Sequence, residues 1–237
     1  MPGSQSASSS FAVTPSLAAA GRLGWARGAL GAALGVLLTG LISHWALGSN
    51  SALPWLMAPM GASAVLMFVF PASPLAQPWP LIGGNLISAA VGLAVHAVVK
   101  DPLFAAAIAL PAAIGLMTLA RCLHPPGGAC ALLGALGGPA MDAVGWQYLA
   151  VPLAINIVVL LTVGLLFNNL TGHRYPHHPK PGPVLAQATW AGSYTEEDLD
   201  AVLADWDEVL DISREDLDAL FRQVERRVQR KWLDDLK

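Results

Sequence analysis

The sequence predicts an all-helical, polytopic membrane protein built from two similar halves, and three observations lead to this prediction. The 237 residues are 54% hydrophobic and only 12% charged, whereas about a quarter of the residues in a typical soluble domain are charged. The mean hydropathy is +0.53. The hydrophobic residues form separate runs, and two of these runs carry the same Pro/Gly pattern at matching places.

Charged residues are distributed unevenly along the chain. From Thr195 to the end there are fourteen acidic and seven basic residues, whereas the preceding part contains only two acids and six bases. A nearly charge-free stretch suits lipid, where charged side chains are costly. We therefore predict a disordered tail over residues 1–24, a transmembrane domain over 25–170, a Pro/His-rich linker over 171–194 and an acidic helical hairpin over 195–237.

Six apolar segments should form the transmembrane domain. They are residues 26–47, 53–70, 81–99, 103–120, 127–138 and 146–167. A helix needs about 20 residues to span the hydrocarbon core, and the fifth segment falls short of this length. Aromatic residues near segment ends suggest an interfacial belt, formed by Trp25, Trp45, Trp55, Trp79, Trp146 and Tyr148.

An internal repeat relates the second and fifth segments. Residues 59–66 and 126–133 both fit the pattern P-x-G-A-x-A-x-L at an offset of 67, and the same offset carries Trp79 onto Trp146. Coincidence in Ala/Gly-rich sequence is the alternative, but the downstream tryptophan favours duplication. Segments broken by Pro and Gly at matching places point to a transporter's binding site. Their free N–H groups and positive dipole ends favour an anion.

The two broken segments leave two topologies open. If both cross the membrane, there are six spans and the halves are inverted; if both re-enter, there are four spans and the halves are parallel. The shortness of residues 127–138 favours re-entry there, whereas residues 53–70 are long enough to cross. Lys100 and Arg121 favour different topologies, so charge does not decide between them.

Basic residues outside the apolar segments indicate the orientation. Arg22 precedes the first segment and Arg27 lies at its start, whereas Arg174 and Lys180 follow the last segment. By the positive-inside rule both termini are then cytoplasmic, which requires an even number of spans. We expect an integral multi-pass protein of the inner (plasma) membrane of a bacterium.

The fifth segment begins with the main candidate for a substrate-binding site. Two prolines remove two backbone donors, and two glycines allow close approach of a ligand or of another backbone. Arg121 could attract an anion or extend to the lipid headgroups. His124 could donate to an anion or cap the broken backbone. The candidate residues are Arg121, His124, Pro125, Pro126, Gly127 and Gly128.

Neutral polar residues elsewhere could line the same path. Gly61 and Ser63 lie in the first broken segment, and Gln77 and Asn85 follow it. The alternative role of such side chains is hydrogen bonding between helices, which is common in membrane bundles. Asn156 roughly matches Asn85 in the second half and is a weaker candidate.

Several function classes are disfavoured by the sequence. No acidic residue lies within an apolar segment, which argues against a carrier of metal cations. We find no catalytic triad, phosphate-binding loop or zinc-protease motif, so neither an enzyme nor a cofactor is expected. His173, His177 and His178 lack an accompanying thiolate or carboxylate, which favours a solvated linker over a metal site. The acidic hairpin has the wrong sign for nucleic acid.

The C-terminal region should form two amphipathic helices. Thr195 with Asp198, and Ser213 with Asp216, have the spacing of capping boxes. Apolar residues at helical spacing follow each start; they are Leu199, Val202, Leu203, Trp206, Val209 and Leu210, then Leu217, Leu220, Phe221, Val224 and Val228. We expect this hairpin to dock on the transmembrane domain or on a second copy, and homo-oligomerisation through it is a hypothesis.

The broken segment also carries a family resemblance. Residues 124–129 read HPPGGA, which resembles the signature of the HPP family of integral membrane proteins. Further blocks similar to the family are residues 61–66, 73–78 and 83–85. The resemblance covers about residues 25–170 and implies four membrane-spanning helices. It also implies a function mostly unassigned, with nitrite transport linked to some photosynthetic members. Some bacterial members carry C-terminal CBS domains, and residues 195–237 resemble only the segment that precedes those domains.

These observations predict a transporter or channel for a small anion, with nitrite as the leading substrate by resemblance alone. The lipid bilayer and the solute would be its partners. The rival interpretation is a non-transporting membrane scaffold or sensor that recruits a partner through the C-terminal helices. A polar path past His124 would support transport, whereas a dry centre packed with Ala and Gly would support the scaffold.

Overall fold

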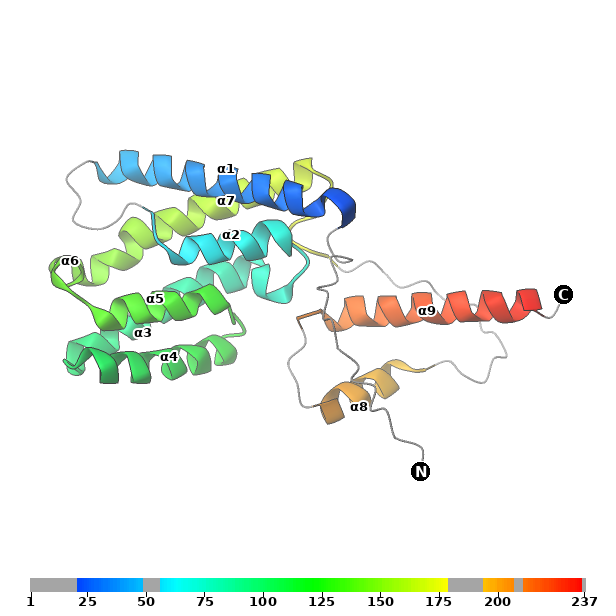
Figure 1. Cartoon of the computed structure of the whole chain (residues 1–237). Coiled ribbons are helices and arrows are strands. Elements are labelled where there is room, and N and C mark those ends of the chain that lie inside the picture. The colour runs from blue at the N-terminus through cyan, green and yellow to red at the C-terminus, as the bar shows by residue number, and fades with distance from the viewer. Residues whose placement is uncertain (1–20, 49–55, 179–193, 207–210, 236–237) are drawn as a thin grey trace, which may run out of the picture.

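The computed structural model describes residues 21–48, 56–178, 194–206 and 211–235, and the regular structure within them is entirely helical. The helices are α1 (Gly21–Leu47), α2 (Pro59–Val69), η2 (Pro74–Ala76), η3 (Pro80–Gly84), α3 (Asn85–Val98), α4 (Pro102–Leu119), α5 (Pro125–Leu136), α6 (Pro139–Val144), η4 (Gly145–Leu149), η5 (Ala150–Ala154), α7 (Ile155–Leu170), α8 (Glu196–Trp206) and α9 (Arg214–Asp235). Helices α1 to α7 form one bundle, and α8 and α9 lie beyond one of its ends (Figure 1).

Four helical stretches of the described chain are long and apolar enough to cross a membrane. They are Gly24–Leu47, Pro80–Val98, Pro102–Leu119 and Pro139–Leu170, and the shorter apolar helices are Pro59–Val69 and Pro125–Leu136. Large apolar side chains cover the outside of the bundle, as lipid contact requires. The predicted all-helical, polytopic membrane fold is therefore confirmed. The predicted tail over residues 1–24 lies almost wholly outside the described residues, and α1 begins at Gly21.

Local sequence explains where several helices begin. Pro59, Pro102, Pro125 and Pro139 each occupy the first turn of a helix, where the missing N–H would have no intrahelical partner anyway. The Asp101 carboxylate caps α4 by accepting hydrogen bonds from the next two free amides of that turn, at 3.0 and 3.1 Å. Helices broken in sequence by proline are thus separate helices with ordinary starts.

The short helix α5 runs from one end of the bundle to the other, beside α3. Gly127 at the start of α5 packs against Gly84 at the start of the α3 segment, and Gly137 after α5 packs against His96 near the end of α3. The two helices are therefore parallel. A helix of twelve residues is about 18 Å long, so the bundle is thin at this place. The fifth segment crosses the bundle and does not return to its starting side (Figure 1).

Helix α2 crosses in the same manner beside α7. The Met57 amide donates to Asn156 near the start of α7, and Met67 contacts Gly164 farther along it. Six helical passes result, and the second three-helix half runs opposite to the first (Figure 1). Of the two topologies that the sequence left open, this arrangement of the bundle favours the inverted one, although only four of the described helices are long enough to cross a membrane by themselves.

The packing of the helices repeats between the two halves. Helix α1 packs on α2 and α7, and α4 packs on α5 and α3. The third helix of each half thus packs against the first helix of the other half: α7 against α1, and α3 against α4. Each third helix has an asparagine at or near its start that donates to the carbonyl four residues earlier: Asn85 to Leu81 O at 2.8 Å, and Asn156 to Pro152 O at 3.1 Å. A π-helical turn precedes Asn85, whereas the segment before α7 is kinked at the non-helical Val151. This equivalence supports duplication.

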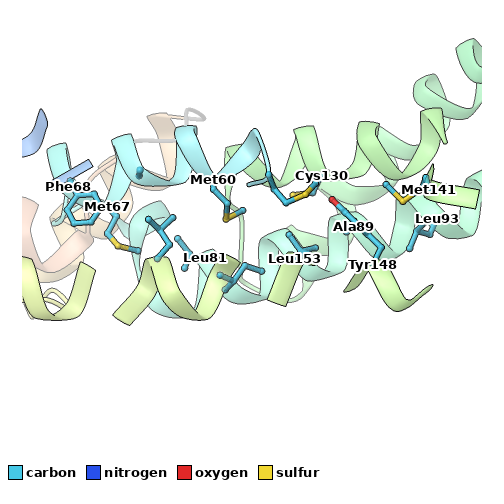
Figure 2. Close-up of a cluster of buried hydrophobic side chains, with 14 of the residues drawn as sticks. Met60, Met67, Phe68, Leu81, Ala89, Leu93, Cys130, Met141, Tyr148 and Leu153 are labelled. Atoms are coloured by element: carbon cyan, nitrogen blue, oxygen red, sulfur yellow. The ribbon is translucent and has the colours of Figure 1, made fainter. Parts of the chain in front are cut away.

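Buried hydrophobic side chains fill the space between the halves. Met60, Met67 and Phe68 from α2 lie near Leu81 and Leu153 in this cluster, and small residues fill the remaining contacts (Figure 2). Cys122 and Cys130 are buried and unpaired, as expected for small core residues. The tryptophans of the proposed interfacial belt that the structure describes, Trp25, Trp45, Trp79 and Trp146, are exposed on the bundle.

The predicted capping boxes are present in the C-terminal helices. The Thr195 hydroxyl accepts from the Asp198 amide at 3.2 Å, and the Thr195 amide donates to the Asp198 carboxylate at 2.8 Å. The Ser213 hydroxyl accepts from the Asp216 amide and donates to its carboxylate, at 3.1 and 2.6 Å. Of the linker, residues 171–178 and 194 are described, and Val209 and Leu210 lie outside the described residues.

Candidate functional site

His124 joins the two broken segments inside the bundle. Its side chain is fully buried, and it precedes α5 in an extended conformation without capping that helix. The ring atom Nδ1 lies 2.8 Å from the Leu75 carbonyl oxygen, and Nε2 lies 2.9 Å from the Ser63 hydroxyl. Because a carbonyl only accepts, Nδ1 carries the proton, and in the neutral ring Nε2 accepts from Ser63. His124 therefore has partners at both nitrogens.

The glycines of the HPPGGA motif bring two backbones into direct contact. A Cβ atom on Gly127 would lie 2.6 Å from the Gly84 carbonyl oxygen and 2.8 Å from Ser88 Oγ. A Cβ atom on Gly84 would in turn collide with His124 and with the Cys122 carbonyl oxygen. Such a contact requires glycine on both sides. This part of the centre is closely packed.

Two predicted site residues lie apart from this contact. Arg121 is exposed and, within the described chain, its side chain forms no hydrogen bond or ion pair. Its backbone has a φ of +53° and ends α4, with the amides of Arg121 and Cys122 donating to the carbonyls of Thr118 and Met117. This is a Schellman motif with arginine at the position that usually holds glycine. Gly61 is exposed, with open space around its Cα.

The remaining motif residues have mainly structural surroundings. Pro125 is exposed, Pro126 is buried, and Gly128 contacts Leu110 of α4. Gln77 braces the turn before α3, because its amide nitrogen donates to the Pro71 and Ser73 carbonyls at 3.0 and 2.8 Å.

A buried polar cluster, of which only Asn85 was predicted from the sequence, lies along the contact between α3 and α5. Asn85 accepts a hydrogen bond from the Cys130 thiol, with 3.2 Å between Sγ and Oδ1. Figure 2 shows the Tyr148 hydroxyl directed toward Cys130. The hydroxyls of Tyr148 and Ser88 are buried and have no hydrogen-bond partner among the described residues. We call Asn85, Ser88, Cys130 and Tyr148 the central polar cluster.

The assignment of Tyr148 to an interfacial belt was wrong. Its side chain is fully buried, because η4 folds inward between α6 and η5 and carries the ring into the bundle. No local signal distinguishes Tyr148 from its exposed neighbour Trp146. Ser88 could have been noticed as a hydroxyl one turn after Asn85 on the same helix, but its burial depends on the contact with α5.

Asn156 occupies the equivalent place in the second half. Its oxygen accepts from the Met57 amide at 3.0 Å, and its nitrogen donates to Ser43 Oγ at 2.9 Å. It thereby holds the start of α2 against α1 and α7. The polar groups at the centre of the bundle are thus uncharged, since Asp101 and Asp142 are both exposed in connections between helices. Hydroxyl, amide and thiol groups can donate hydrogen bonds to a small solute there.

Arg27 lies at the end of the bundle that bears α8 and α9, which we call the hairpin end. One guanidinium nitrogen donates to Asn168 Oδ1 and Thr171 Oγ1 at 2.9 and 3.0 Å, and the other donates to the Phe68 carbonyl at 2.7 Å. The group also lies 5.7 Å from the centre of the Phe167 ring. Its partners are all neutral. The sequence indicated Arg27 only as a marker of orientation.

The histidines after α7 do not form a metal site with other described residues, among which no group of three suitable ligands occurs. His177 donates to Asp216 at 2.8 Å, whereas His173 and His178 contact nearby carbonyls. Tyr175 is buried and donates to the Ala76 carbonyl at 2.6 Å, and this burial raises the pKa of its phenol. The described part of the linker is therefore anchored on the bundle.

The fold defines a class: an all-helical membrane protein with two inverted halves and an uncharged polar centre. The chain belongs to the HPP transmembrane family, whose model of the transmembrane region matches residues 18–176. Two similar proteins of Dictyostelium discoideum are named only as transmembrane proteins. One is 37% identical over 147 residues (60% of this chain, 51% of the relative), and the other 33% identical over 159 residues (65% and 50%). The chain spans about half the length of these curated relatives. No solved structure matches it significantly.

Proposed function

We propose that the protein carries a small anion across the membrane, with nitrite as the leading substrate because of the family resemblance. The observation that carries this proposal is the pair of buried hydroxyls, Ser88 and Tyr148, without described partners. A buried donor without a partner costs about 1–3 kcal/mol, and such groups in membrane segments often mark solute pathways. The two acidic residues of the bundle, Asp101 and Asp142, are both exposed, and an interior without carboxylates among its described residues suits an anion better than a cation.

The proposed path follows the central polar cluster, in which Ser88 lies against Gly127 of the HPPGGA motif. The backbones of Gly84 and Gly127 touch, so no solute fits between them. His124, with Ser63, holds the two halves together beside the path. Arg121, exposed at the hairpin end, would then attract anions to the entrance. No catalytic step is part of this proposal.

A specific observation favours the rival function, a scaffold or sensor. The close glycine contact between α3 and α5 is the arrangement expected of a purely structural centre. Helix α9 also exposes apolar side chains that a partner protein or a second copy would cover: Leu220, Phe221, Val224, Val228 and Trp232.

Charge at the two ends supports an orientation. Arg27, Arg121 and Arg174 lie at the hairpin end, whereas Lys100 lies at the opposite end together with both acids of the bundle. With six passes, Arg121 lies at the same end as Arg27 and Arg174, which supports one orientation of the bundle. By the positive-inside rule we propose that the hairpin end and both termini are cytoplasmic, in a bacterial plasma membrane.

Flux measurements on purified protein test the proposal. Proteoliposomes that contain the wild type should take up nitrite faster than empty liposomes. Tyr148→Phe and Ser88→Ala should each lower that rate by about tenfold, because a hydrogen bond to an anion contributes about 1.5–3 kcal/mol. Thr162→Val, which removes an exposed hydroxyl on α7, is the matched control. Wild-type liposomes no leakier to nitrite than empty ones would reject the substrate.

A further inference from the structure

The acidic hairpin is attached to the hairpin end of the bundle through two carboxylates. The Ser73 hydroxyl donates to Asp211 Oδ1 at 2.6 Å. The His177 ring nitrogen Nε2 donates to Asp216 Oδ2 at 2.8 Å. Ser73 belongs to the turn after α2, and His177 lies in the part of the linker that is anchored on the bundle. Asp211 and Asp216 flank the start of α9.

A cavity of about 420 Å³ lies at this junction. The bundle contributes Arg27, Ser73, His173 and His177 to its wall, and the hairpin contributes Asp211 and Asp216. The volume exceeds the space needed by a small inorganic anion with its first waters, each of which takes about 30 Å³ in the liquid.

Arg27 is the fixed positive charge in the bundle's share of the cavity wall. Arg27 has no carboxylate within ion-pair distance among the described residues, and its hydrogen bonds go to neutral acceptors. The Nε atom of Arg27 is buried and has no hydrogen-bond partner among the described residues. The carboxylates that line the cavity come from the hairpin alone. Without the hairpin, the wall would hold one arginine, two histidines and no acid.

We propose that this cavity is an anion vestibule, and that Asp211 and Asp216 close it as tethered competitors of the anion. The vestibule deepens the proposed function, on which it rests, because it would deliver anions to the bundle. A carboxylate held on the same chain has a high local concentration and blocks the site by default. A free anion that binds beside Arg27 displaces the hairpin by mass action. The hairpin therefore senses the anion that the bundle admits.

Hydrogen–deuterium exchange of the full-length protein in nanodiscs measures hairpin docking without any flux assay. Sodium nitrite is the probe, and sodium gluconate at equal ionic strength controls for charge screening. We expect nitrite to speed exchange at the start of α9, residues 211–220, by about three- to tenfold, because each docking contact contributes only a few-fold at a surface. Equal responses to the two salts, or no response to either, would overturn the vestibule.

Two variants complete the exchange experiment. Asp211→Asn combined with Asp216→Asn should give fast exchange that no longer depends on nitrite. Glu215→Gln, an exposed change on the same turn, should behave as the wild type. Unchanged exchange at α3 and α5 verifies that the bundle stays folded. If the double variant stays docked and sensitive to nitrite, the carboxylates are not the competitor and the proposal is wrong.

Measurements of nitrite flux distinguish a failure of the vestibule proposal from a failure of the transport proposal. The double variant should admit nitrite faster than the wild type into proteoliposomes, and equal rates would contradict closure by the hairpin. If no variant carries nitrite but nitrite still releases the hairpin, the transport proposal fails while the anion site stands.

Discussion

Nε2 of His124 lies 2.9 Å from the hydroxyl oxygen of Ser63, and this hydrogen bond joins the two Pro/Gly-broken segments of the chain. The sequence presents these residues as members of two similar breaks. In the structure they are partners across the interface between the two halves. The histidine of the HPPGGA motif thus stabilises the contact between the two halves.

Removal of the Ser63 hydroxyl tests the contribution of this hydrogen bond to stability. Ser63→Ala leaves a fully buried ring nitrogen without a donor, which should destabilise the bundle by about 1–3 kcal/mol. Thermal unfolding in mild detergent should show a lower Tm. Thr118→Ala, which removes an exposed hydroxyl on α4, should change the Tm little. A Ser63→Ala protein as stable as the wild type would show that the hydrogen bond carries no net stability.

Two glycine substitutions test the contact between α3 and α5. At Gly92 an added Cβ would collide with the Ala131 carbonyl oxygen, so Gly92→Ala should cost about 1–3 kcal/mol or more. At Gly115 of α4 no atom lies within 4 Å of the added Cβ. Gly115→Ala should therefore stabilise the helix by about 0.5–1 kcal/mol. Unfolding midpoints of the pair should move in opposite directions, and equal midpoints would refute the packing.

Cysteine labelling tests the six-pass topology. With six passes, Arg121→Cys lies on the hairpin side and Lys100→Cys on the opposite side. If α2 and α5 re-entered instead, the two positions would exchange sides. A membrane-impermeant maleimide applied from one side of oriented vesicles should modify only one of the two variants. The wild type is the blank, since its two cysteines are buried. If each cysteine were instead labelled from the side opposite to the expected one, the result would support re-entrant α2 and α5.

Arg121→Gly separates the roles of backbone and side chain at the end of α4. Glycine adopts the left-handed conformation of Arg121 without a Cβ penalty, so the variant should gain up to about 1 kcal/mol of stability. If Arg121 attracts anions, nitrite uptake should fall in the same variant. A higher Tm with unchanged uptake would assign Arg121 a purely local role.

The hairpin should lose structure in acid. Backbone and side-chain hydrogen bonds from Thr195 lower the pKa of Asp198, a side-chain hydrogen bond from Arg214 lowers that of Asp200, and one from Arg222 lowers that of Asp218. A carboxyl whose pKa is lowered by folding contributes stability above its unfolded value of about 3.9 and loses it as the pH falls through the folded value.

Helicity of the hairpin should therefore be constant from neutral pH to about pH 5 and fall below about pH 4. A spin label at the exposed Ala201 of α8 should become mobile in that range, and a label at Thr118 in the bundle should not. Asp198→Asn should reduce the part of the acid-induced loss of helicity that comes from this carboxyl group. A transition centred near neutral pH would point to the histidines instead.

Local features of the sequence were good guides to local structure. Apolar runs located the helices, because lipid requires long uncharged stretches. The proline-led starts and both capping boxes were readable, because each depends on residues within one turn. The family was recognisable from the HPPGGA motif and its neighbouring blocks, and the family comparison confirmed it.

The candidate site was only partly predictable. Ser63, His124 and Asn85 are buried polar residues that bond between elements, but Arg121 is exposed and Gly61 faces open space. The cluster partner Tyr148 carries no local signal, and Ser88 is marked only by its place one turn after Asn85; the burial of both results from how α5 and η4 pack. Arg27 was visible as a charge, whereas its place beside a cavity and a carboxylate-bearing hairpin was not.

The sequence alone determined that this is a duplicated, helical HPP-family membrane protein with an acidic C-terminal region. These properties follow from composition, short-range periodicity and a repeated motif. Only the tertiary structure decided that the short helices cross, that the halves are inverted, and that Ser63 meets His124 across 61 residues of chain. Such pairings depend on close contact between whole helices, where glycines at two distant positions must coincide, and no local pattern specifies that coincidence.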